Sequence, residues 1–260
     1  MKTGLILLIF LIHTFVLNAQ SGIDGPSVGL VRDPSGAVRP VLGLAANFWL
    51  GKPVAVGVLS CGFSGRAGLL KTSSRLLVLD ARGQTTATLD APEGPALFAF
   101  SRDGAPSLVY YPLAGQIQRW VVGRLEPIPL DTHAIPGVVL ALSYNGGPWA
   151  TLLVQRDRTI WKLTISTFTG FVRTRTAVPG IAAPVLLNGD GSLVYSTAHG
   201  VILRRADGSE TPLAGPVSAA GLTRLGEDWI LAREPGNGRS FALRLTPGRE
   251  RAYQLPEVAR

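Results

Sequence analysis

The chain has 260 residues, 46% of them hydrophobic, and a formal net charge of +8 at pH 7. Charged residues make up only 16% of it without a run of like charge, which argues against a basic tail or patch that binds nucleic acid. Cys61 is the single cysteine, so an intramolecular disulfide is excluded and the fold relies on packing alone.

The first 19 residues have the pattern of a secretory signal peptide. Lys2 is a short positive region, an apolar run follows from Leu5 to Leu17, and Ala19 is a small residue at the expected cleavage point. An uncleaved membrane anchor is the alternative, because Leu17 stands where a smaller residue is preferred. We expect cleavage of residues 1–19. The mature protein would then be secreted, periplasmic or on the cell surface, with no transmembrane span.

Residues 20–260 are predicted to form one domain that begins with a β-hairpin within residues 27–45. The segments Val28–Val31 and Val38–Leu42 flank the sequence Asp33-Pro34-Ser35-Gly36, whose residue types favour a tight turn.

A Gly beside a Pro, or one residue from it, then recurs at nearly constant intervals. From Gly51 it returns at Gly94, Gly137, Gly180 and Gly215, after 43, 43, 43 and 35 residues. Repeats of about 40 residues that are filled with short strands are typical of a β-propeller. The predicted repeats are 51–93, 94–136, 137–179, 180–214 and 215–260.

Each repeat has four predicted strands. The inner strands are apolar, such as 138–144, whereas Glu126–Leu130 carries two prolines and belongs at an outer edge. In the first repeat, the run Val54–Ser60 is predicted as the inner strand. Because no window keeps a helical period, the predicted fold class is all-β.

Two blade counts remain open. The hairpin is either a separate element beside five four-stranded blades, or part of an incomplete sixth blade. Extending the 43-residue register backwards places the hairpin at the third and fourth strand positions of such a blade.

The segment Phe98-Ala99-Phe100-Ser101-Arg102-Asp103-Gly104, followed by Leu108-Val109-Tyr110, resembles the turn and strand of TolB-like and WD40-like propellers. The stretch from Gly29 to Gly43 is similar to the opening of secreted propeller-like proteins from soil bacteria. The resemblance implies a propeller and brings no catalytic residue with it.

No catalytic, cofactor-binding or metal-binding residue is predicted, and we expect no cofactor. His133 and His199 lie in predicted loops without metal-ligand spacing. Asp103, Asp190 and Glu227 are candidate channel carboxylates, although turn formation explains them better. Cys61 stands in an apolar stretch, which favours a small buried side chain over a reactive thiol.

The five tryptophans offer a second choice of role. Trp149 and Trp229 stand at offsets 12 and 14 within their repeats, and Trp120 and Trp161 at 26 and 24, so packing between blades is the preferred interpretation. Sugar stacking at the mouth of the channel is the alternative.

The specific function is not encoded in any motif. We expect a monomeric, secreted, non-enzymatic binding or scaffold module for a protein or polysaccharide partner, because propeller loops and channels form binding surfaces. The alternative is a hydrolase or lactonase whose site assembles at the channel mouth from separate blades. Carboxylate, Asn or His side chains that meet there would favour the enzyme, and an aliphatic lining would favour the scaffold.

Overall fold

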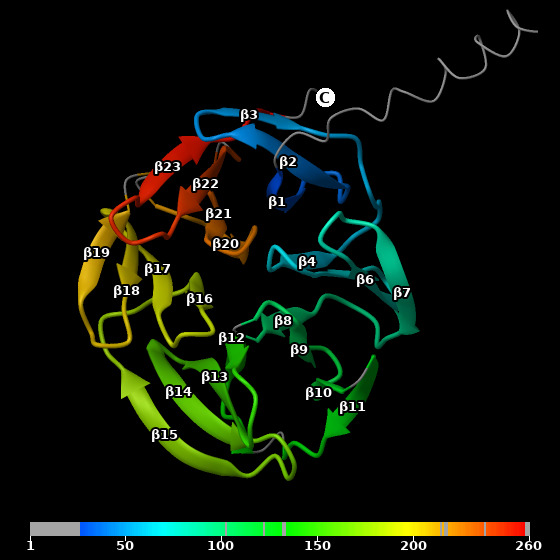
Figure 1. The fold of residues 1–260 in the computed structure, drawn as a ribbon. Coiled ribbons are helices and arrows are strands. Elements are labelled where there is room, and N and C mark those ends of the chain that lie inside the picture. Colours follow the sequence, from blue (N-terminus) through cyan, green and yellow to red (C-terminus); the bar gives the residue numbers. More distant parts are fainter. Residues whose placement is uncertain are drawn as a thin grey trace, which may run out of the picture.

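The computed structural model describes residues 27–257 except 102, 122, 132–133, 214, 216–217 and 237. The predicted signal peptide (1–19) and His133 therefore lie outside the described residues. Six sheets surround a central axis, which makes the protein a six-bladed β-propeller (Figure 1). The part of the chain that is described contains no α-helix, and hence no helix of the length and apolar character that spans a membrane.

The blades are numbered here in chain order. Blade 1 has three antiparallel strands, and the other five have four each, in sequence order from the axis outwards. Blade 1 comprises β1 (Ser27–Arg32), β2 (Val38–Leu44) and β3 (Asn47–Leu50). Blade 2 comprises β4 (Ser60–Phe63), β5 (Gly68–Lys71), β6 (Arg75–Leu79) and β7 (Thr85–Asp90). Blade 3 comprises β8 (Leu97–Phe100), β9 (Pro106–Tyr111), β10 (Gln116–Val121) and β11 (Arg124–Ile128). Blade 4 comprises β12 (Val138–Tyr144), β13 (Trp149–Arg156), β14 (Thr159–Ser166) and β15 (Val172–Val178). Blade 5 comprises β16 (Val185–Leu187), β17 (Leu193–Thr197), β18 (Gly200–Arg204) and β19 (Glu210–Leu213). Blade 6 comprises β20 (Gly221–Arg224), β21 (Trp229–Arg233), β22 (Ser240–Arg244) and β23 (Arg251–Gln254).

The core is divided among the interfaces between neighbouring blades. Successive side chains of a strand point to opposite faces of the sheet. Leu152 of β13 therefore packs toward blade 3, and Leu153 packs toward blade 5. The interface of blade 6 with blade 1 is built the same way, with Leu231 and Leu255 against Val41. The second strands of blades 3 to 6 (β9, β13, β17 and β21) are buried on both faces, which explains their mainly apolar sequences.

Blade 1 supplies the incomplete sixth blade. Around the axis the first strands of the other blades touch one another, and β20 contacts β4 directly. β1 contacts β4 and also β21, the second strand of blade 6. Blade 1 thus has no innermost strand among the described residues, so its hairpin occupies the second and third positions, and the prediction of the third and fourth was wrong. β3 is the outer strand of blade 1. Residues 51–59, which the 43-residue register counted as part of the second blade, form the connection from β3 to β4.

The inner strand of blade 2 also differs from its prediction. It is β4, beginning at Ser60, and not the apolar run Val54–Ser60. Val56 is 70% exposed, and Gly57 has a φ of +66°, so this run forms the connection between β3 and β4. Apolar composition alone was misleading here, because most of the run bonds to the start of β2 and the turn before it, through the Val38–Ala55 bridge and the Val58 amide to the Gly36 carbonyl oxygen, and not to an inner strand.

The ring closes at a seam between β1 and the β20–β21 turn. The Leu30 amide donates a hydrogen bond to the Leu225 carbonyl oxygen at 3.2 Å. Gly29 has a φ of +150°, and a Cβ there would lie 1.5 Å from that same oxygen. A Cβ on Gly226 would lie 2.1 Å from the Val28 carbonyl oxygen. Close backbone approach at two glycines therefore permits the seam.

We predict that Gly29→Ala and Gly226→Ala each lower the free energy of unfolding by about 2 kcal/mol or more, because each new methyl group forces two backbones apart. Urea denaturation measures the effect. Gly221→Ala is the matched control, since nothing lies within 4 Å of its added Cβ, and it should leave stability unchanged or raise it by up to about 1 kcal/mol. Equal stability of all three variants and the parent would contradict this account of the seam.

Candidate functional site

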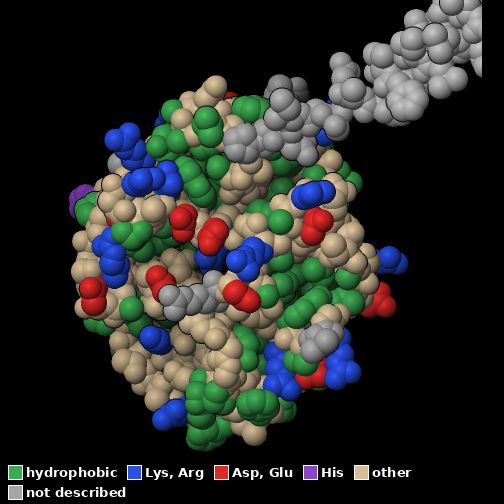
Figure 2. Space-filling model, viewed as in Figure 1, with side chains coloured by type: hydrophobic (Ala, Val, Ile, Leu, Met, Phe, Trp, Pro, Cys, Tyr) green, Lys and Arg blue, Asp and Glu red, His purple; other side chains and the backbone are tan. Residues whose placement is uncertain are grey.

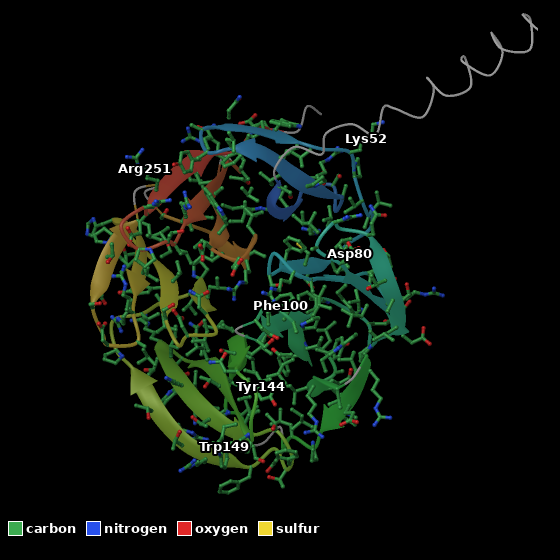
Figure 3. All side chains as sticks on the ribbon, in the orientation of Figure 1. Lys52, Asp80, Phe100, Tyr144, Trp149 and Arg251 are labelled. Atoms are coloured by element: carbon green, nitrogen blue, oxygen red, sulfur yellow. The ribbon has the colours of Figure 1, made fainter. Side chains whose placement is uncertain are left out.

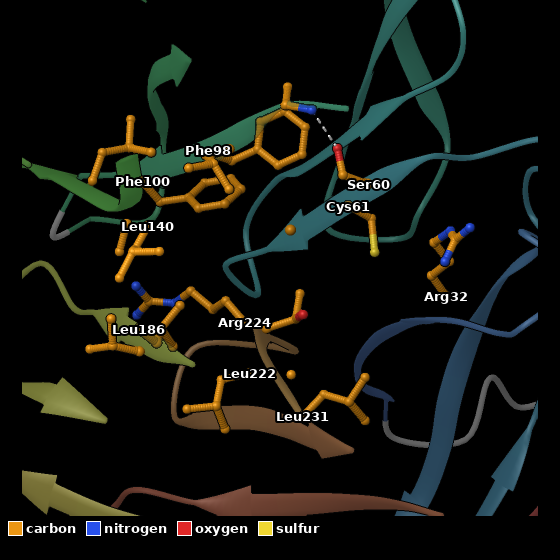
Figure 4. A pocket seen from close by; sticks show the side chains of 18 of the residues that line it. Arg32, Ser60, Cys61, Phe98, Phe100, Leu140, Leu186, Leu222, Arg224 and Leu231 are labelled. Carbon is orange, nitrogen blue, oxygen red and sulfur yellow. Dashed lines mark hydrogen bonds between the residues drawn. The ribbon is translucent and has the colours of Figure 1, made fainter. Parts of the chain in front are cut away.

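A cavity of about 270 Å³ lies in the central channel. The inner strands of blades 2 to 6 all contribute to its wall, together with residues from blade 1. The wall is mainly aliphatic and aromatic, and Figure 4 shows Phe98, Phe100, Leu140, Leu186 and Leu222 around the space. The aliphatic part agrees with the lining that was expected to favour a scaffold, but three arginines (Arg32, Arg224 and Arg233) also line the cavity. Figure 3 places Phe100 near the axis and Trp149 and Arg251 at the periphery.

Turns that join the first and second strands of the blades ring one mouth of the channel, and their carboxylates hold the turns. Asp190 accepts hydrogen bonds from the amide and hydroxyl of Ser192 at 2.9 and 2.6 Å. Asp103 accepts a bond from the Ser101 hydroxyl, which helps to lower the pKa of the Asp103 carboxyl. These two candidate carboxylates serve the turn-forming role that the sequence favoured.

Arg224 ends β20 at this mouth. Its guanidinium donates hydrogen bonds to the carbonyl oxygens of Gly226 at 3.4 Å and Glu227 at 3.2 Å. Burial lowers the pKa of Arg224, and the negative charges of Asp190, Asp228 and Glu227 oppose that effect. Figure 2 shows acidic and basic side chains gathered around the centre of this face. The mouth is therefore a charged rim above an apolar channel.

Arg32 and Arg233 form a second basic group, away from Arg224. Arg233 pairs with Gly221, at the opposite end of β20 from Arg224. The Arg233 guanidinium donates to the Arg32 carbonyl oxygen, and Arg32 Nε donates to the Val58 carbonyl oxygen. Arg32 lies on the opposite side of the cavity from Arg224 (Figure 4).

Cys61 lies on β4 beside these arginines. Its sulfur points toward the side of the cavity where Arg32 lies (Figure 4). Burial raises the pKa of the Cys61 thiol to about 11, and the charges of Arg233 and Arg32 only partly oppose this. The thiol is therefore protonated and weakly nucleophilic at neutral pH, although Cys61 is half-buried and lines the cavity where the sequence predicted a buried side chain.

The histidine and tryptophan predictions have definite outcomes. His199 is exposed in the β17–β18 turn, and no group of three potential metal ligands occurs among the described residues. Trp120 and Trp161 pack against interface clusters, and Trp229 meets the Phe48 ring edge-on at 5.8 Å. Within the described lining of the channel there is no tryptophan, so sugar stacking by this residue type at the channel is not supported.

Sequence reasoning missed Arg32, Arg224 and Arg233 as channel residues. Arginine was interpreted as scattered over solvent faces, where its stem packs and its head is wet. Each of the three ends a strand, and no local pattern distinguishes these positions from Arg204 or Arg244, which also end strands but line the outer parts of blades.

No family model and no curated protein matches the sequence. Among solved structures, a protein of unknown function from Bacteroides caccae has a TM-score of 0.54 at 11% identity, covering 88% of this chain and 93% of that chain. TolB from Acinetobacter baumannii has a TM-score of 0.50 at 14% identity, over 96% and 69%. The Neurospora crassa Pan2 WD40 domain has a TM-score of 0.47 at 11% identity, over 90% and 80%. At such identities the likeness concerns the fold alone, and it agrees with the expected TolB-like propeller architecture.

We predict slow alkylation of Cys61 in the folded protein. Because its pKa of about 11 exceeds the ordinary value of 9.0, at about pH 8 its thiolate fraction should be ~100-fold below that of the urea-unfolded chain. Iodoacetamide labelling followed by mass spectrometry measures the two rates. The native rate should keep rising through pH 10, whereas the unfolded rate should level off above pH 9.

The raised pKa of Cys61 also makes the stability of the protein fall at high pH. Because the unfolded thiol loses its proton first, the contribution of Cys61 to stability is complete below pH 9 and is lost as the pH rises toward 11. Cys61→Ser should lack this component of the pH dependence. A native labelling rate that levels off near pH 9 would contradict the raised pKa.

Proposed function

We propose that the protein is a secreted, non-enzymatic binding module whose channel holds an apolar ligand or an apolar segment of a partner. The observation that carries this proposal is the apolar wall of the 270 Å³ cavity, to which the inner strands of five blades contribute. Pockets that bind organic ligands are mostly apolar, with a few polar groups that fix orientation. The charged rim around Arg224 supplies such groups at the entrance.

The arrangement of carboxylates favours binding over hydrolysis. Asp103 and Asp190 are engaged by their own turns, and Asp228 accepts a hydrogen bond from Thr246 at 3.1 Å. Among the described residues none of the rim carboxylates is hydrogen-bonded to another or to a histidine. A hydrolase or lactonase needs a positioned acid, base or nucleophile, so this alternative lacks a supporting contact.

Export is the second part of the proposal. It rests on the N-terminal pattern of residues 1–19 and on a fold with Cys61 alone, which needs no disulfide. Expression of the full chain in a bacterial host should release a protein whose first residue is Gln20, as measured by intact mass. Recovery of only the uncleaved chain in the membrane fraction would show that the segment is an anchor.

We predict that N-phenyl-1-naphthylamine, an uncharged apolar fluorophore, binds the protein saturably with one site. Leu222→Asp should weaken this binding at least ~10-fold, because a carboxylate would be desolvated in the apolar wall by the dye. Fluorescence titration measures both affinities, and thermal unfolding checks that the variant is folded.

Leu113→Asp is the control for this experiment. Leu113 is 75% exposed and follows β9, outside the channel lining, so its change should not affect the dye. Equal affinities of the parent and Leu222→Asp would overturn the channel as the binding site. Turnover of simple esters, lactones or glycosides by the purified protein, lost in a rim carboxylate variant, would overturn the non-enzymatic assignment.

A further inference from the structure

Two cationic side chains lie between two cavities where blade 1 has no inner strand among the described residues. Besides the channel cavity, a cavity of about 610 Å³ lies at the seam of blades 1 and 6. Arg32 and Arg233 line both cavities and are the side chains that the two described linings share. The pair therefore forms the wall between the channel and the seam.

Neither guanidinium has an anionic partner in the described part of the chain. The ion pairs of the described residues involve neither Arg32 nor Arg233. A guanidinium has five N–H donors, and each of the two donates one side-chain hydrogen bond, to a backbone carbonyl oxygen. Most of the N–H groups of the pair are therefore open to a ligand.

The charges around the pair do not neutralise it. Asp33 lines the seam cavity, but its oxygens accept hydrogen bonds from Ser35, Ala37 and Arg39, the last at 3.1 Å. Glu257, an exposed residue, and Arg39 complete the charged lining of the seam cavity. Three arginines thus face two carboxylates, one of which is already paired. Burial and the neighbouring charge of Arg32 lower the pKa of Arg233, and the charges of Cys61 and Asp33 oppose this without reversing it.

We infer that Arg32 and Arg233 bind one oxyanion group of an amphipathic ligand whose apolar part lies in the channel. Each guanidinium can donate paired hydrogen bonds to a carboxylate or phosphate, so both are suited to an oxyanion that lies between the two cavities. Next to the pair the channel wall is apolar, with Leu30, Leu59 and Leu231. The inference names the ligand chemistry of the channel and so rests on the proposed function.

The test is displacement of N-phenyl-1-naphthylamine by octanoate and by octanol, which share an apolar chain and differ in charge. Octanoate should displace the dye with an affinity at least ~10-fold higher than octanol. In Arg233→Gln and Arg32→Gln, octanoate should lose at least ~10-fold in affinity, whereas octanol should be unchanged. In Arg32→Gln the glutamine amide places an N–H donor near the position of the Arg32 Nε, which donates to the Val58 carbonyl oxygen, whereas Arg233→Gln is shorter and loses the hydrogen bond from the Arg233 Nη2 to the Arg32 carbonyl oxygen.

Arg251→Gln is the matched control, since Arg251 is exposed on the outermost strand of blade 6 (Figure 3), and it should behave as the parent. If a glutamine variant does not fold, competition on the parent protein decides. Sodium sulfate should weaken octanoate binding more than sodium chloride of equal ionic strength does, and should leave octanol binding unaffected. Octyl phosphate in place of octanoate distinguishes a phosphate from a carboxylate ligand.

Equal affinities of octanoate and octanol in the parent, or octanoate binding that both glutamine variants retain, would overturn the arginine pair while leaving the apolar channel in place. Failure of the dye itself to bind would instead overturn the proposed function. The two failures are therefore separable in one set of titrations.

Discussion

The structure depends on apolar packing between blades, which can be satisfied only if the ring closes. Each middle strand carries apolar side chains on both faces, as Leu152 and Leu153 do toward two different neighbours. A single blade would expose both faces to water, so every blade needs a neighbour on each side. The last interface, where Val41 of blade 1 meets Leu231 and Leu255 of blade 6, is therefore as necessary as any other.

Closure by an incomplete blade has a consequence at the axis. β1 lies beside β21, the second strand of blade 6, so in the described part of the chain no strand takes the innermost position of blade 1. Arg233 donates to the Arg32 carbonyl oxygen at this edge and so satisfies a backbone acceptor that an inner strand would otherwise pair. The same geometry brings two guanidinium groups together in a partly dry region, where a charge without a partner is unfavourable. Ring closure and the candidate anion site therefore have one structural cause.

In the proposed function, the channel and its rim make different contributions to ligand binding. The apolar wall supplies non-directional burial, which scales with the area removed from water. Arg224, held by its own turn and surrounded by Asp190, Asp228 and Glu227, supplies a directional feature at one end. Arg32 and Arg233 supply another at the far side. A rigid propeller with such a channel is suited to a ligand that has an apolar body and a charged end.

The sequence by itself determined the all-β class, the propeller architecture and most strands. β12 (138–144) has the predicted limits, because alternation and Gly-containing turns are local properties. It also determined the turn role of Asp103 and Asp190, which depends on residues within two positions along the chain. The prediction of Val54–Ser60 as the inner strand of blade 2 was wrong. Its apolar composition is local, but whether a segment becomes a strand also depends on a partner strand, which the local sequence does not specify.

Only the tertiary structure decided the number of blades, the place of the hairpin and the residues of the channel. β1 lies beside β21, and Leu30 bonds to Leu225, across almost the whole length of the chain. Arg32 and Arg233 become neighbours for the same reason. Nothing near either arginine in the sequence specifies the other, because their contact arises from closure of the ring and not from spacing along the chain.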